Sequence, residues 1–127
     1  MNIEVGDIIN INVENDNKLG EHRKTKYGVV VVSIKQDNTF NFFCINTENR
    51  KRYECIEIKK ENYSFLKNEI HYISCSDIFI ANTKQINSKQ NTKLTAEDKN
   101  TLLNKVKESV RLPKKYKDEI FNAFNKK

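Results

Sequence analysis

The sequence has few of the residues that build disulfide scaffolds or metal centres. Its three cysteines, Cys44, Cys55 and Cys75, are an odd number and show no CxxC spacing. We therefore expect no disulfide framework and a reducing compartment. The two histidines, His22 and His71, belong to no paired His-carboxylate motif. This argues against a transition-metal enzyme, and we expect neither a metal ion nor another cofactor.

Several familiar motifs are also missing. The sequence contains no P-loop, dinucleotide-binding fingerprint, zinc-ligand spacing or serine-hydrolase elbow, and no internal repeat. Residues 1–5 show neither the basic region nor the apolar stretch of a signal peptide or membrane span. We therefore expect a cytoplasmic protein.

Length and composition favour one small domain. A chain of 127 residues suits a single domain, and it buries roughly two-thirds of its unfolded surface on folding. Hydrophobic residues make up 37% and charged residues 31%, and the seven Phe and five Tyr argue against a disordered chain. We expect a small, aromatic-rich core.

The formal net charge of +6 is unevenly distributed. Residues 1–17 carry four acidic side chains and no basic one, whereas positive charge is concentrated further along the chain. Clusters of this kind suit a polyanion such as nucleic acid, although a solvated lysine-rich surface has the same composition. The basic clusters are Lys18 with Arg23, Lys24 and Lys26; Arg50 to Arg52; Lys84, Lys89 and Lys93; and Arg111 with Lys114, Lys115 and Lys117.

Residues 27–47 should form the centre of the fold. Residues 27–34 are a nearly continuous β-branched run, which indicates a strand buried on both faces. Residues 40–47 are rich in aromatic side chains, and the polar residues 35–38 between the two segments are suited to a turn. The two segments are therefore predicted to pair as an antiparallel hairpin.

Strand patterns flank this hairpin on both sides. Residues 3–13 contain a Gly-Asp turn followed by alternating Ile9, Ile11 and Val13, which predicts a half-buried strand. We expect about five strands in total. The later elements are a strand within 50–60, a helical turn or loop at 62–68, a strand within 69–80 interrupted at 74–77, and brief pairing at Ile86.

Helix signals occur only near the end of the chain. Thr95 and Asp98 have capping-box spacing, and apolar residues follow at helical intervals, which predicts an amphipathic helix over 96–110. Pro113 occupies the first position of a second predicted helix. The fold class is therefore α+β: a small curved antiparallel sheet or SH3-like barrel with one or two C-terminal helices. The single domain, 1–127, divides into a mainly β part at 1–86, a connector at 87–95 and helices at 96–126.

A functional site is expected where the polar loop of residues 14–26 meets the hairpin. The loop is longer than a hairpin connection needs, and long loops in compact domains are commonly functional. It leads directly into the buried strand, and the paired strand ends at residues 46–48, just before Arg50-Lys51-Arg52. In an antiparallel hairpin these two strand ends would face one cleft.

Such a cleft would hold groups suited to attack on an RNA phosphodiester. Arg23 and Lys26 would stabilise charge developing on the phosphate, while the hydroxyl of Thr47 or the carboxylate of Glu48 orients the ribose 2'-hydroxyl. Each group also has an ordinary structural interpretation: Thr47 as a strand end, Glu48 as a turn carboxylate and Tyr27 as a packing residue. The residues expected to bind RNA are Lys18, His22, Lys24, Arg50, Lys51, Arg52 and, as a base-stacking platform, Tyr27.

The order of these features resembles the MazF/PemK (Kid-like) toxin endoribonucleases, and the similarity extends to about Val110. The matching stretches are Val5-Gly6-Asp7-Ile8, the basic loop ending at Lys26, the apolar strand Val29 to Ser33, Ile45-Asn46-Thr47, and downstream Ile73-Ser74, Ile78, Ile86, Leu94 and the helix after Thr95. The family usually has Arg-Pro before the apolar strand, where this chain has Lys26-Tyr27-Gly28. Either Arg23 or Lys26 would therefore take the role of the family's arginine, and Thr47 is shifted by one residue from the family's Thr.

The resemblance implies the toxin component of a toxin-antitoxin system. It implies a metal-independent endoribonuclease that cleaves single-stranded RNA, in which the 2'-hydroxyl attacks the phosphate and leaves a cyclic phosphate. It also implies a homodimer neutralised by an antitoxin, either a protein or, in a type III (ToxN-like) system, an RNA. The alternatives are a non-catalytic nucleic-acid-binding module and a protein-interaction domain whose charge is incidental.

Overall fold

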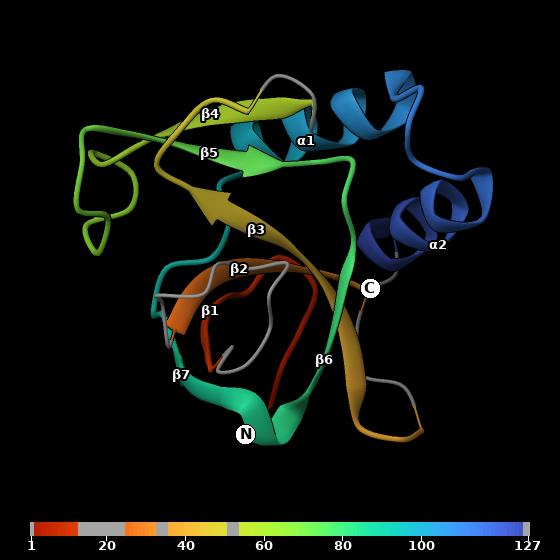
Figure 1. Cartoon of the computed structure of the whole chain (residues 1–127), viewed down its shortest axis with the longest axis horizontal. Helices are drawn as coiled ribbons and strands as arrows, with labels where there is room; N and C mark the ends of the chain where they lie inside the picture. Colours follow the sequence, from red (N-terminus) through yellow and green to blue (C-terminus); the bar gives the residue numbers. More distant parts are fainter. Residues whose placement is uncertain (1, 13–24, 33–35, 51–53, 126–127) are drawn as a thin grey trace.

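The computed structural model describes residues 2–12, 25–32, 36–50 and 54–125. These residues form an antiparallel sheet followed by two α-helices (Figure 1). The strands are β1 (Ile8–Asn12), β2 (Thr25–Val32), β3 (Thr39–Asn46), β4 (Cys55–Lys59), β5 (Ile70–Ser74), β6 (Phe79–Asn82) and β7 (Ile86–Lys89), and the helices are α1 (Ala96–Glu108) and α2 (Lys114–Asn125).

The predicted α+β class with two C-terminal helices is confirmed, but the number of strands is higher than expected. The described residues contain seven strands in the order β4-β5-β3-β2-β1-β7, with β6 also paired to β3. The predicted strand over residues 69–80 is two separate strands, and pairing at Ile86 continues to Lys89, into the expected connector. The sheet is curved but does not close into a barrel (Figure 1).

The hairpin of β2 and β3 is the centre of the sheet, as predicted. The two strands pair antiparallel, with Gly28 opposite Cys44 and Val30 opposite Phe42. Because successive strand residues point to opposite faces, Val29 and Val31 enter one core cluster and Val30 enters another. All three valines are fully buried. The β-branched run of β2 is therefore enclosed on both faces, as its composition indicated.

The long strand β3 is flanked on one side by β2 and on the other by two short strands. Thr39 to Phe42 pair with β6, whereas Ile45 and Asn46 pair with β5. In Figure 1, β3 runs diagonally between β4 and β5 near α1 and the group of β1, β2 and β7. The break between β5 and β6 lets the chain follow β3 along its whole length, which accounts for the additional strand.

The two helices cover one core cluster and begin at the predicted signals. The hydroxyl of Thr95 accepts a hydrogen bond from the backbone N–H of Asp98 at 3.1 Å, and α2 begins directly after Pro113. Leu102 and Val106 of α1 and Ile120 of α2 are fully buried in the cluster that contains Phe43. Neither of these helices is both long and apolar enough to cross a membrane.

The first helix ends earlier than its apolar periodicity suggested. It stops at Glu108, and the side chain of Val110 is 91% exposed. The turn that follows is held by Glu54, whose carboxylate accepts hydrogen bonds from the Ser109 hydroxyl and from the backbone N–H of Val110. Burial alone would raise the pKa of Glu54. The hydrogen bonds from Ser109, Val110 and the backbone of Arg111 outweigh it, and the pKa is lower than its ordinary value.

Candidate functional site

A pocket of about 520 Å³ opens where β2 begins and β3 ends. This volume lies in the range that small-molecule and nucleotide sites commonly occupy. The described residues that line it are Asn10, Thr25, Lys26, Tyr27, Ile45, Thr47, Phe65, Leu66, Lys67, Asn68 and His71. The pocket therefore lies at the meeting of strand ends where the sequence predicted a site.

Strand register explains why these residues share one face. Directly opposed residues of an antiparallel sheet point to the same side. Asn10 of β1 is opposite Tyr27 of β2, and the β2–β3 register, continued by one residue, sets Tyr27 opposite Ile45. Two residues further along, the same registers set Thr25 of β2 opposite Thr47, and Thr47 opposite His71 of β5. The floor of the pocket is thus made by two adjacent rows of side chains.

The segment between β4 and β5 forms one wall of the pocket. The segment is folded back on itself by a backbone hydrogen bond from Lys60 to Glu69 at 2.9 Å. Phe65 packs against Tyr27 in a tilted arrangement, with ring centroids 4.7 Å apart and an interplanar angle of 41°. An aromatic pair beside a pocket is a surface on which an unpaired nucleobase can stack.

Tyr63, at the base of this wall, anchors it to the start of α1. Its hydroxyl accepts a hydrogen bond from the Thr95 N–H at 3.0 Å and donates one to the Asp98 carboxylate at 2.5 Å. Burial and the bond to Asp98 raise the pKa of Tyr63 to about 12, so the hydroxyl keeps its proton at physiological pH. The wall is therefore fixed to the helical layer.

The polar groups in the pocket differ in chemistry. Lys26 and Lys67 supply cationic ammonium groups, Thr25 and Thr47 supply hydroxyls, and His71 supplies an imidazole. Burial lowers the pKa of His71, which favours the neutral ring. Cations, hydroxyls and a neutral imidazole together suit an anionic ligand such as a phosphate.

The structure places some of the predicted site residues in this pocket and others outside it. Lys26, Tyr27 and Thr47 line it. Glu48 and Arg50 are exposed, and neither is among its lining residues. Lys18, His22, Arg23, Lys24, Lys51 and Arg52 lie outside the described residues.

Eight lining residues were not among the predicted site residues. They are Asn10, Thr25, Ile45, Phe65, Leu66, Lys67, Asn68 and His71. Strand pairing, rather than a local sequence pattern, brings residues such as His71 to the pocket, because His71 lies on β5 and β5 pairs with β3. Phe65 to Asn68 were expected in a helical turn or loop, and nothing in that assignment indicated which strand ends the segment would cover.

A chain of polar contacts fixes the end of β3 beside Thr47. The side-chain amide of Asn46 donates a hydrogen bond to the Ser74 hydroxyl at 2.7 Å. The Cys55 sulfur lies 3.7 Å from the same hydroxyl and donates to the carbonyl of Arg50 at 3.2 Å. Asn46, just before Thr47, and Cys55, at the start of β4, therefore both contact Ser74 of β5.

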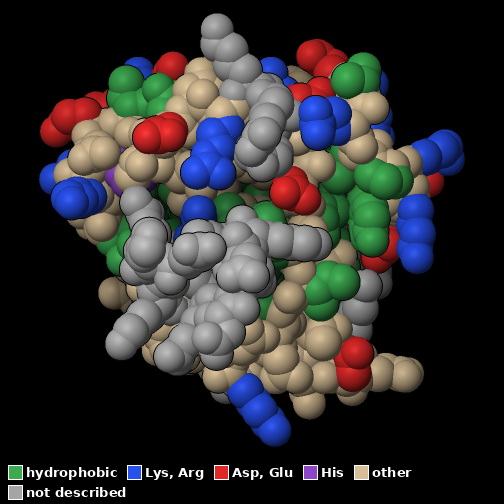
Figure 2. All heavy atoms as spheres, in the orientation of Figure 1, with side chains coloured by type: hydrophobic (Ala, Val, Ile, Leu, Met, Phe, Trp, Pro, Cys, Tyr) green, Lys and Arg blue, Asp and Glu red, His purple; other side chains and the backbone are tan. Residues whose placement is uncertain are grey.

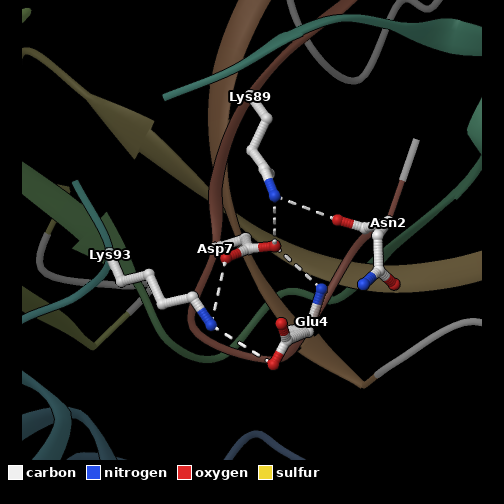
Figure 3. A network of polar contacts seen from close by, with 5 residues as sticks. All are labelled: Asn2, Glu4, Asp7, Lys89 and Lys93. Atoms are coloured by element: carbon white, nitrogen blue, oxygen red, sulfur yellow. Dashed lines mark hydrogen bonds and ion pairs between the residues drawn. The ribbon is translucent and has the colours of Figure 1, made fainter. Parts of the chain in front are cut away.

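The stretch Val5-Gly6-Asp7-Ile8 has a structural role (Figure 3). Gly6 adopts a φ of +91°, which favours glycine, and its N–H donates to the Val30 carbonyl at 2.8 Å. The buried Asp7 carboxylate accepts from the Glu4 N–H at 2.8 Å and lies 3.6 Å and 4.0 Å from the ammonium groups of Lys93 and Lys89. This network joins the first residues of the chain to β7 and the connector.

On one face of the molecule, the charge of the described residues is mixed rather than concentrated. On the face seen in Figure 2, lysine and arginine side chains are interspersed with aspartate and glutamate around the described surface. Among the described residues, no group of three His, Cys, Asp or Glu side chains is placed to hold a metal ion.

No protein-family model matches the chain, and a search of curated proteins finds no matching relative.

Proposed function

We propose that this chain is an endoribonuclease that cleaves single-stranded RNA without a metal ion and acts as the toxin of a toxin-antitoxin system. The observation that carries the proposal is the shared pocket of Lys26, Tyr27 and Thr47. The sequence pattern predicts contacts of these residues with phosphate, base and ribose. All three line one pocket with a second lysine, Lys67, and with His71.

In the proposed reaction the ribose 2'-oxygen attacks the adjacent phosphorus, and the bond from phosphorus to the 5'-oxygen breaks. The 2'-hydroxyl loses its proton and the departing 5'-oxygen gains one, so the products are a cyclic phosphate and a 5'-hydroxyl end. Lys26 stabilises the negative charge that develops on the phosphate oxygens. The Thr47 hydroxyl orients the ribose, and Tyr27 with Phe65 stacks the neighbouring base.

The toxin role and its partners rest on the resemblance to the MazF/PemK family. In this proposal the chain acts as a homodimer and is restrained by an antitoxin, which is a protein or an RNA. Co-expression with a short open reading frame or tandem RNA repeat encoded next to the chain separates these two partners. Relief of growth arrest by either one identifies the antitoxin, and unimpaired growth on expression of the chain alone contradicts the toxin role.

The first experiment is incubation of the purified protein with mixed-sequence RNA in excess EDTA, followed by mapping of the new ends. We expect discrete cuts that leave cyclic phosphates. Thr47→Val, which removes the hydroxyl at nearly constant size, should lower the rate by about 100-fold, and Lys26→Met by a similar factor. Lys107→Met alters an exposed lysine of α1 that does not line the pocket and should leave cleavage unchanged.

A second candidate function is RNA binding without cleavage. It is favoured by one observation: among the described residues that line the pocket, none is a carboxylate that could serve as a general base. Two lysines and an aromatic pair are sufficient to hold a single strand. If the folded protein binds RNA with strong salt dependence and produces no new ends, this second function replaces the first.

A further inference from the structure

His71 occupies a position in the pocket that gives it more than a packing role. It is the second residue of β5, and the β3–β5 register, continued by one residue from Asn46 opposite Tyr72, places it beside Thr47. The residue is only 6% exposed, yet it lines the pocket. Its imidazole therefore meets solvent mainly through the site itself.

The hydrogen bonds of His71 define its protonation. The backbone N–H of Asn68 donates to Nε2 of His71 at 3.0 Å. A backbone N–H can only donate, so Nε2 carries the lone pair and the proton of the neutral ring is on Nδ1. Burial lowers the pKa of His71, which agrees with a neutral ring at physiological pH.

Nδ1 is free to act on a ligand. It forms no hydrogen bond with the described residues. It is also absent from the fully buried side-chain atoms that lack a hydrogen-bond partner. The described side chains that have such atoms are Asn41 and Ser76. Nδ1 of His71 is therefore not sealed from solvent, and the N–H that it carries is an unused donor on a residue that lines the pocket with Lys26 and Lys67.

We propose that neutral His71 donates a hydrogen bond from Nδ1 to a phosphate oxygen of bound RNA, and that it is not the acid or base of the reaction. This inference rests on the proposed function, because it specifies how the same pocket holds its phosphate. A proton-transfer role would require the Nε2 lone pair, and the Asn68 N–H occupies it. A fixed N–H donor aimed at a phosphate contributes without any change of its own protonation.

Two substitutions separate a donor from a proton carrier. Asparagine has its amide nitrogen at the δ position, so His71→Asn can keep the donor while it loses the contact with Asn68. Glutamine has its amide oxygen at the ε position, so His71→Gln can keep the acceptor for Asn68 while it loses the donor. Thermal unfolding and circular dichroism of both variants establish that each is folded.

We expect His71→Gln to lower kcat by about 100-fold and His71→Asn to stay within about 10-fold of the wild type. The dependence of kcat on pH between about 5 and 8 should have the same shape in His71→Asn and the wild type. Equal, severe losses in both variants, with a limb of the pH profile removed, overturn the inference and assign proton transfer to His71.

Binding of an uncleavable 2'-deoxy oligonucleotide keeps this test independent of the proposed nuclease activity. We expect His71→Gln to weaken binding about 10-fold and His71→Asn to bind within about 3-fold of the wild type. If the wild-type protein binds but never cleaves RNA, the nuclease proposal fails while this comparison still tests the donor. If both variants bind as tightly as the wild type, or the wild type does not bind at all, the inference is wrong.

Discussion

Asn41 on β3 is a buried polar residue whose side chain is not satisfied. The residue is 1% exposed, and neither its amide nitrogen nor its amide oxygen has a hydrogen-bond partner among the described residues. It lies where the β2–β3 register shifts, with Val30 opposite Phe42 and Val32 opposite Asn41. An unpaired buried amide reduces stability, because it loses its hydrogen bonds to water on folding without replacing them.

Asn41→Leu should therefore raise the free energy of unfolding by about 1 to 3 kcal/mol. Urea unfolding followed by circular dichroism measures the change, and an unchanged slope shows that the effect lies in the folded state. Asn91→Leu, at an exposed position, should change stability by less than about 0.5 kcal/mol. Destabilisation by Asn41→Leu would mean that the amide has a partner, such as a buried water, in solution.

His71 should also make the stability of the fold depend on pH. Its pKa in the folded state lies below the ordinary value of 6.5 because the ring is buried. In the window below that value the unfolded chain binds more protons, so stability is full above about pH 6.5 and declines as the pH falls. His71→Gln should flatten this decline between about pH 7 and 5. The same slope in both proteins would assign the acid sensitivity to other groups.

At the scale of elements, the pocket wall depends on the contact between Tyr63 and the N-terminus of α1. The Tyr63 hydroxyl bridges the Thr95 N–H and the Asp98 carboxylate, a carboxylate that a capping box would have directed to the Thr95 backbone. The spacing of Thr95 and Asp98 thus predicted where the helix begins. It did not predict that a tyrosine from a loop distant in sequence would complete the cap.

Tyr63→Phe should destabilise the protein by about 1 to 3 kcal/mol, because it leaves the Thr95 N–H and the Asp98 carboxylate without their partner. The folded-state pKa of Tyr63, about 12, lies above its ordinary value of 10, so its contribution is full below pH 10 and declines as the pH rises through about 12. Thermal unfolding at pH 7 and pH 11 measures both effects. Tyr72→Phe is the matched control, since the Tyr72 hydroxyl forms no hydrogen bond with the described residues. Equal losses in the two variants would contradict the capping role.

At the scale of the whole molecule, local pattern predicted the elements, and only strand pairing determined the site. The β-branched run of residues 29–32 and the turn before Thr39 were sufficient to predict the central hairpin, because both signals are local. The position of His71 depends on the pairing of β5 with β3 and on the break between β5 and β6. No local sequence pattern predicts this pairing. Lys26 and Thr47 were found in advance because an antiparallel hairpin by itself brings its two open ends together.

The Asp7 network should contribute to the stability of the whole fold but not to its site. The Asp7 carboxylate is almost fully buried and joins the N-terminal turn to Lys89 and Lys93 (Figure 3). None of these three residues lines the pocket that contains Thr47. Asp7→Asn keeps an acceptor for the Glu4 N–H but removes the charge that faces two lysines. We expect a loss of about 1 to 3 kcal/mol in the free energy of unfolding. The loss should be smaller at high salt, because salt screens the attraction between Asp7 and the two lysines.

Glu4→Gln is the matched control, because the Glu4 side chain is 61% exposed and its ion pair with Lys93 should contribute less than about 1 kcal/mol. Cleavage assays at a temperature where every variant is folded then separate stability from chemistry. Asp7→Asn should cut RNA at the wild-type rate while Thr47→Val does not, since only Thr47 lines the pocket. A slow Asp7→Asn variant that is fully folded would show that the N-terminal turn acts on the site, and would require the reacting groups to be sought beyond the β2–β3 pocket.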